Sequence, residues 1–194
     1  SEMCIRDSPD CLTILSAGGS QGASRLNEAV VQLLAYEQKK GNINHIHGYG
    51  KHGRDTFMQS LEDNGVDAGN PHFIIKEYID NMYTCMCASD LIITRAGAMT
   101  LTEIMAIGRA SVLIPYPYAA ENHQYYNALT LQNANAGRII DDKELTGSVL
   151  IDTVNRLADD PELLRLMSEN AAKLSKRDAA GKILREITEL MGIK

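Results

Sequence analysis

Residues 11–24, with the sequence CLTILSAGGSQGAS, place an apolar run directly before a loop of small residues. From Leu26 onward, apolar side chains recur at helical spacing to about Gln38, and Lys39-Lys40-Gly41 is a typical helix end. A buried strand, a glycine-rich turn and a helix, in this order, are typical of the first unit of a parallel α/β sheet. The stretch therefore predicts an α/β domain whose first strand ends near Ala17.

Five further short segments continue this alternation along the chain. The predicted strands are residues 44–48, 73–76, 91–94, 111–114 and 138–140. The predicted helices are residues 54–63, 80–89, 99–107 and 122–135, and residues 143–190 contain only helical patterns. Strands that alternate with helices indicate right-handed βαβ units. We therefore predict a Rossmann-like parallel sheet of about six strands, with helices on both faces.

The composition is that of one soluble globular domain. The 194 residues include 19 Lys and Arg against 25 Asp and Glu, a net charge of −6, which argues against a dedicated nucleic-acid partner. No apolar run approaches the roughly 18–20 residues that span a bilayer. Residues 1–10, SEMCIRDSPD, match nothing downstream and are interpreted as a leader foreign to a domain that covers 11–194. The four cysteines are expected to be reduced thiols of a cytoplasmic protein.

The glycine-rich turn at residues 18–22, GGSQG, is compatible with several kinds of site. A Walker loop is excluded because no Lys follows, and a dinucleotide fingerprint would need an acid where residues 47–50 read HGYG. The turn also satisfies G-x-S-x-G, so Ser20 could be a hydrolase nucleophile with Asp90 and His123 as partners. A tight turn without a ligand and a phosphate-binding loop are the other readings.

Two further segments support phosphate and sugar binding. Residues 94–100, TRAGAMT, follow the fourth strand and open a helix, so their amides converge on the same edge as the first turn. Glu103, one turn later, could accept ribose hydroxyls, or it could complete a capping box that starts at Thr100. Residues 121–124, ENHQ, offer polar groups for sugar hydroxyls, or form an ordinary polar loop.

Three histidines raise the question of a metal site. His45 and His47 alternate on the second predicted strand and therefore share a face, with His52 nearby. We interpret them as ordinary strand and loop histidines, and we expect no bound metal.

These segments together resemble the donor-binding half of the MurG family of UDP-N-acetylglucosamine transferases. The matching stretches, in chain order, are GGSQGASRLN, KEYIDNM, ITRAGAMTLTEIMAIGRASVLIPYP and ENHQYYNALTLQNANAGRII. The resemblance implies the C-terminal half of a GT-B fold. It also implies an inverting reaction of peptidoglycan synthesis, in which GlcNAc moves from UDP-GlcNAc to lipid I and lipid II forms.

The resemblance implies a set of donor-binding residues. Ser20 matches a serine that contacts the diphosphate, and the backbone of Ile79 matches the uracil-binding position. The loop and helix start that hold the diphosphate match Ala98, Met99, Thr100, Leu101, Thr102 and Glu103. Glu103 would bind the ribose, and Gln124 matches a glutamine that reads the sugar hydroxyls. His123 stands where a close relative has Gln.

The resemblance assigns the remaining functions to an N-terminal domain outside this sequence. That domain would supply the general base, the lipid I site and the membrane contact, so the chain alone is expected to bind its donor without turnover. UDP-GlcNAc is a substrate, and no cofactor is expected. The full-length enzyme would be cytoplasmic and peripheral on the inner face of the bacterial membrane. The alternatives are a free-standing donor subunit with a membrane-bound partner, and the serine hydrolase.

Overall fold

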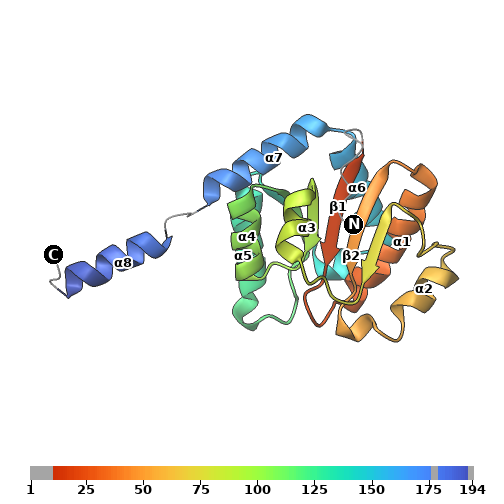
Figure 1. Cartoon of the computed structure of the whole chain (residues 1–194), viewed down its shortest axis with the longest axis horizontal. Coiled ribbons are helices and arrows are strands. Elements are labelled where there is room, and N and C mark those ends of the chain that lie inside the picture. Colours follow the sequence, from red (N-terminus) through yellow and green to blue (C-terminus); the bar gives the residue numbers. More distant parts are fainter. Residues whose placement is uncertain (1–10, 176–178, 192–194) are drawn as a thin grey trace.

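The computed structural model describes residues 11–175 and 179–191 (Figure 1). The predicted leader at residues 1–10 lies outside these ranges. In the described part of the chain, six parallel strands form one sheet in the order β3-β2-β1-β4-β5-β6. The strands are β1 Leu12–Ala17, β2 Ile43–Gly48, β3 Phe73–Lys76, β4 Leu91–Thr94, β5 Ala110–Leu113 and β6 Gly137–Ile139. The prediction of a six-stranded Rossmann-like sheet is confirmed.

Helices cover both faces of this sheet, as predicted. These helices are α1 Ser24–Lys40, α2 Phe57–Asp63, α3 Met82–Ala88, α4 Ala98–Ile107, α5 His123–Asn133, α6 Gly147–Ala158 and α7 Pro161–Leu174, and a further helix, α8, spans Ala179–Leu190. Three short 3-10 turns are η1 Lys51–Gly53, η2 Ala120–Asn122 and η3 Asp142–Glu144. The predicted helix at 54–63 begins only at Phe57, because the chain first forms η1.

Two hydrophobic clusters fill the space between the sheet and its helices. Ile14 belongs to the cluster under α1, α2 and α6, whereas Leu15, the next residue of β1, belongs to the cluster under α3, α4 and α5. Successive side chains of a strand point to opposite faces, so a strand that is covered on both sides is largely apolar. The strand β2 departs from this pattern, because it buries the polar side chains of Asn44, His45 and His47.

The sheet order places a switch point between β1 and β4. The chain winds outward from β1 through β2 to β3, and then returns to the other side of β1 with β4. In open α/β sheets, ligands bind outside the carboxyl ends of the strands at such a point. A ligand-binding site is therefore expected at the loops after β1 and β4.

The helix α8 lies apart from the α/β body in Figure 1, and its exposed apolar side chains include Leu184, Ile187 and Leu190. None of the helices in the described ranges combines the length and the apolar character needed to cross a bilayer.

Candidate functional site

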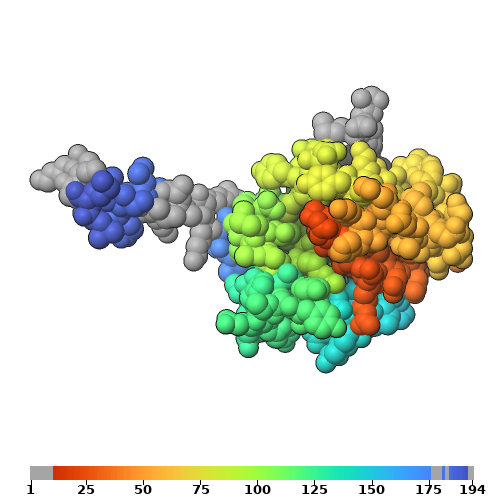
Figure 2. Space-filling view, turned by 90° about the horizontal axis from the view of Figure 1, so that it is seen from below, coloured from red at the N-terminus to blue at the C-terminus, as the bar shows by residue number. Residues whose placement is uncertain are grey.

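The loop after β1 forms a tight turn at the carboxyl edge of the sheet. Gly22 donates its N–H to the carbonyl oxygen of Gly19 at 2.9 Å, and the two glycines have φ values of +85° and +89°. Only glycine adopts such values without strain. Ser20 and Gln21 occupy the tip of the turn and are exposed. Figure 2 views this edge from below, where the red-orange turn lies between the yellow and green segments.

The neighbouring loop after β2 holds this turn in place. His52 donates its N–H to the carbonyl oxygen of Gln21 at 2.8 Å, and Lys51 donates its N–H to the carbonyl oxygen of Ser20 at 3.2 Å. From α1, the Asn27 side chain donates to the carbonyl oxygen of Tyr49 at 2.9 Å. The turn that presents Ser20 is therefore hydrogen-bonded to the loop after β2, and that loop is hydrogen-bonded to α1.

A pocket of about 140 Å³ opens beside the turn. It is lined by Ala17, Gly19, Ser20, Gly48, Glu77, Tyr78, Ile79 and Met82. The Ile79 side chain is buried and packs on Gly48, where an added Cβ would lie 3.1 Å from Ile79 Cδ1. The structure thus brings Ser20 and Ile79, which were predicted from separate segments, to one pocket.

The start of α4 differs from the prediction. The helix begins at Ala98 with Gly97 as its N-cap residue, and within the described chain no side chain caps this end. Leu101 donates its N–H to the carbonyl oxygen of Gly97 at 3.0 Å, so Thr100 already lies inside the first turn. The capping box starting at Thr100 is therefore wrong. The N–H groups of the first three helical residues have no partner within the helix and remain available to an anion.

The side chains of this first turn and a half divide between solvent and core. Ala98, Met99 and Glu103 are exposed, whereas Leu101 is buried against the sheet. Thr102 donates its hydroxyl to the carbonyl oxygen of Ala98 at 2.9 Å. The side chain of Glu103 makes no hydrogen bond or ion pair with any residue that the structure describes, so its carboxylate can accept hydroxyl groups.

Gln124, in the first turn of α5, connects two loops of the same edge. Its Oε1 accepts the N–H of Tyr116 at 3.0 Å and the N–H of Ala96 at 3.2 Å. The carbonyl end of this side chain is thereby occupied, and the amide NH₂ is the end left for a ligand oxygen. Asn127 also donates to the carbonyl oxygen of Ala96, at 3.3 Å.

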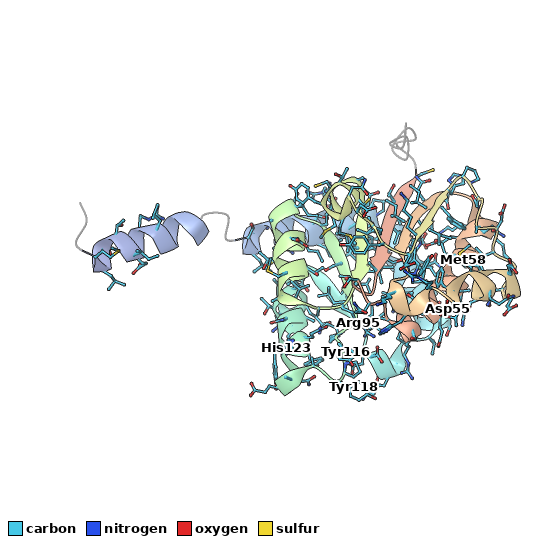
Figure 3. The ribbon with its side chains drawn as sticks, turned by 60° about the horizontal axis from the view of Figure 1, so that its bottom comes forward. Asp55, Met58, Arg95, Tyr116, Tyr118 and His123 are labelled. Atoms are coloured by element: carbon cyan, nitrogen blue, oxygen red, sulfur yellow. The ribbon has the colours of Figure 1, made fainter. Side chains whose placement is uncertain are left out.

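Sequence reasoning missed a charged cluster that joins these loops. Arg95, directly after β4, forms an ion pair with Asp142 of η3 at 2.5 Å, and Arg25 of α1 donates to the carbonyl oxygen of Asp142 at 2.7 Å. Figure 3 shows Arg95 on the same edge as Tyr116, Tyr118 and His123. No local signal reveals this cluster, because its members come from three distant segments.

The geometry rules out the serine hydrolase alternative. Ser20 follows the carboxyl end of β1, whereas Asp90 precedes β4 and accepts the N–H of Thr13 at the opposite edge of the sheet. The Nδ1 of His123 lies 2.8 Å from the carbonyl oxygen of Ala120, so it donates its proton there and not to an acid. The three groups cannot form a triad.

The histidines on β2 share a face as predicted, and their partners are Ser16 and Glu37. The Ser16 hydroxyl lies 2.7 Å from His45 Nε2 and 2.7 Å from His47 Nδ1, and Glu37 Oε2 lies 2.7 Å from His45 Nδ1. All four side chains are buried, whereas His52 is exposed. Among the described residues, no group of three or more His, Cys, Asp or Glu side chains could hold a metal ion.

The stability of the chain is expected to fall in mild acid because of His47. Its complete burial, with a smaller contribution from His45, lowers the pKa of His47 from 6.5 to about 3. Between these values the unfolded chain binds more protons than the folded chain, so stability is lost as the pH falls below about 6.5. We expect a loss of about 2 kcal/mol between pH 7 and pH 5 in urea unfolding experiments.

A matched variant separates His47 from the other titrating groups. His47→Asn keeps an acceptor close to the Nδ1 position, where Ser16 can donate, and removes the titration. Its unfolding free energy should change much less over the same pH range. An unchanged pH dependence in this variant would contradict the assignment to His47.

A Rossmann-like sheet with a glycine-rich turn and an open helix start at its switch point defines a half-domain of the GT-B class. Residues 13–183 match the glycosyltransferase family 28 C-terminal domain, and the chain belongs to this family.

Named relatives agree with this membership. The chain is 38% identical to the UDP-N-acetylglucosamine–N-acetylmuramyl-(pentapeptide) pyrophosphoryl-undecaprenol N-acetylglucosamine transferase of Desulforamulus reducens, over 94% of this chain and 49% of that protein. It is 40% identical to the enzyme of the same name from Desulfitobacterium hafniense, over 94% and 49%. The crystal structure of Acinetobacter baumannii MurG has a TM-score of 0.79 and 30% identity, over 94% of this chain and 51% of that one. The chain spans about half the length of the relatives it matches.

Proposed function

We propose that residues 11–194 form the UDP-GlcNAc-binding domain of a transferase that adds GlcNAc to lipid I and so makes lipid II for peptidoglycan. The observation that carries the proposal is the joint position of Ser20 and Ile79 in one pocket at the carboxyl edge of the sheet, where β1 pairs with β4 and the open start of α4 follows β4. Relatives that carry the name of this transferase support the choice of donor and reaction.

Each part of the donor has a matching group at the edge of the sheet. Uracil would enter the pocket at the backbone of Ile79, and the Glu103 carboxylate would accept the ribose hydroxyls. The diphosphate would lie between Ser20 and the free amides of residues 98–100. The NH₂ group of Gln124 would donate to a hydroxyl of the sugar.

The same arrangement suits departure of the nucleotide. Negative charge grows on the β-phosphate as the bond to the sugar breaks. Helix-end amides that already point at that position stabilise the charge without reorganisation. This half of the reaction needs no covalent nucleophile from the residues assigned here.

The acceptor half of the reaction belongs, in this proposal, to an N-terminal domain like the one that completes the relatives, which are about twice as long as this chain. That domain would bind lipid I, supply the general base and contact the membrane. The whole enzyme would then be peripheral on the cytoplasmic face, and the present chain would bind its donor without turnover.

A titration with several nucleotides tests the proposal. Isothermal calorimetry and NMR shift titration of the chain should detect binding of UDP and UDP-GlcNAc, with weaker binding of UDP-glucose and none of AMP. Absence of any heat or shift at millimolar UDP would refute the proposed function.

Glu103→Ala is expected to weaken UDP-GlcNAc binding by about 1–3 kcal/mol, the scale of a charge-assisted hydrogen bond. Its unfolding free energy should stay within about 0.5 kcal/mol, because Glu103 is exposed and is not a helix cap. Glu62→Ala, an exposed carboxylate on α2, is the matched control and should leave binding unchanged. Unchanged affinity in Glu103→Ala would remove the ribose role.

A further inference from the structure

The Arg95 guanidinium connects three segments at the carboxyl edge of the sheet. Arg95 Nη1 donates to Asp142 Oδ1 at 2.5 Å and lies 3.2 Å and 3.4 Å from the carbonyl oxygens of Ile114 and Pro115. Both charged side chains are only 14% exposed. The contacts tie the loop after β4 to the loop after β5 and to η3, which follows β6. We call Arg95, Asp142 and Arg25 the loop brace.

Arg25 brings the first turn of α1 into the same cluster. It donates to the carbonyl oxygen of Asp142 at 2.7 Å, and its guanidinium lies 3.9 Å from Asp142 Oδ2. The first turn of α1 contains no acidic residue, and a cation at a helix N-terminus is unfavourable. Asp142 offsets this cost, so its carboxylate and carbonyl groups serve two arginines at once.

The loop brace also reaches the residue proposed to read the sugar. The Arg95 guanidinium lies 5.7 Å from the centroid of the Tyr116 ring, and the N–H of Tyr116 donates to Gln124 Oε1 at 3.0 Å. On its other side, Arg95 is followed by Ala96, whose N–H also binds Gln124. Displacement of Arg95 would therefore move the start of α4 and Gln124 together.

The nucleoside part of the proposed site stands on other elements. Its pocket is lined by residues at the ends of β1 and β2 and in the segment after β3, among them Ala17, Gly48 and Ile79. The Arg95–Asp142 pair lies on the opposite side of the switch point, after β4 and after β6, and only Arg25 reaches across to α1. A change in the Arg95–Asp142 pair would thus act mainly on the part of the donor site that follows β4 and β5.

We propose that the Arg95–Asp142 pair is a positioning pair, which holds the start of α4 and Gln124 for the diphosphate and sugar of the donor and contributes nothing to nucleoside binding. This inference rests on the proposed function. A site works only while its supporting contacts hold it in place, and displacements below one ångström already weaken it.

The test compares uridine, UDP and UDP-GlcNAc binding to the full chain by NMR shift titration. Asp142→Ala should raise the Kd for UDP and UDP-GlcNAc about tenfold, which is about 1.4 kcal/mol, and leave the Kd for uridine unchanged. Asp142→Asn keeps the shape of the side chain and one acceptor oxygen, so its Kd values for UDP and UDP-GlcNAc should lie between those of the wild-type chain and those of Asp142→Ala. If Asp142→Ala folds poorly, Asp142→Asn provides the same test.

Arg165→Lys is the matched control, because Arg165 pairs with Glu162 and Glu169 on α7, away from the site. It should leave all three affinities unchanged. A wild-type chain that binds no UDP would overturn the proposed function and this inference with it. Wild-type UDP binding, combined with variants that lose uridine and UDP affinity equally or lose neither, would overturn the inference alone.

Discussion

Gly22→Ala is expected to lower the free energy of unfolding by about 2–6 kcal/mol and to abolish UDP binding. Two effects add at this position. Gly22 has a φ of +85°, where a side chain is strained, and an added Cβ would lie 2.3 Å from the carbonyl oxygen of Tyr49. The backbone must move to relieve this overlap, and the turn that presents Ser20 would move with it. Urea unfolding and UDP titration measure the two losses.

Gly41→Ala controls for the backbone strain alone. Gly41 ends α1 with a φ of +71°, and no described heavy atom outside its chain neighbours lies within 4 Å of its added Cβ. Its cost should be about 1 kcal/mol, with UDP binding unchanged. If Gly22→Ala and Gly41→Ala lost the same unfolding free energy, the close contact between the loops after β1 and β2 would add nothing to the cost of a positive φ.

The inner strands β1, β4 and β5 were predictable from sequence because they are covered on both faces. Leu91–Thr94 and Phe73–Lys76 match their predicted bounds, and the later strands begin one residue before the predicted positions. A short apolar run between polar loops has few other interpretations in a chain with this alternation. The first and last residues of a strand are harder to predict, because burial at the edge of a sheet depends on the loops that fold over it.

The start of α4 was not predictable from its local pattern. Thr100 and Glu103 satisfy a capping box, yet Gly97 has an extended conformation and the helix begins directly after it. Two helix starts three residues apart both fit the sequence, and the structure has the earlier one, with Leu101 buried. The correction bears on function, since it leaves the Glu103 carboxylate without a capping role.

Contacts between residues far apart in the chain could not be predicted from the sequence for a different reason. Arg95 and Asp142 lie 47 positions apart, and each would pass for an ordinary loop charge. Glu37 lies on the buried side of α1. Because it is close to the charged C-terminal end of this helix, the sequence gives no sign that its carboxylate turns inward. Gln124 was predicted as a ligand-binding side chain, and the two N–H groups that occupy its oxygen became evident only in the fold.

The second large effect is expected from His45→Leu, which should cost about 3–5 kcal/mol of unfolding free energy. The Glu37 side chain is fully buried, and its Oε1 already lacks a partner in the described structure. His45 provides the hydrogen bond to Oε2 at 2.7 Å. Replacement of His45 leaves both carboxylate oxygens of Glu37 buried without a donor. The resulting loss of unfolding free energy is much larger than that expected when an exposed ion pair is broken. Glu162→Ala, which breaks an exposed pair on α7, should cost less than about 1 kcal/mol.

The double variant Glu37→Leu/His45→Leu distinguishes an unpaired carboxylate from a general loss of packing. With both partners replaced by apolar side chains, no charge is left in the core, and such replacements are often close to neutral. The Ser16 hydroxyl keeps its hydrogen bond with His47 Nδ1, so it stays satisfied. We therefore expect the double variant to regain most of the stability that His45→Leu loses, in urea unfolding at pH 7. A double variant as unstable as the single one would mean that the shape of the core, and not the buried charge, sets the cost.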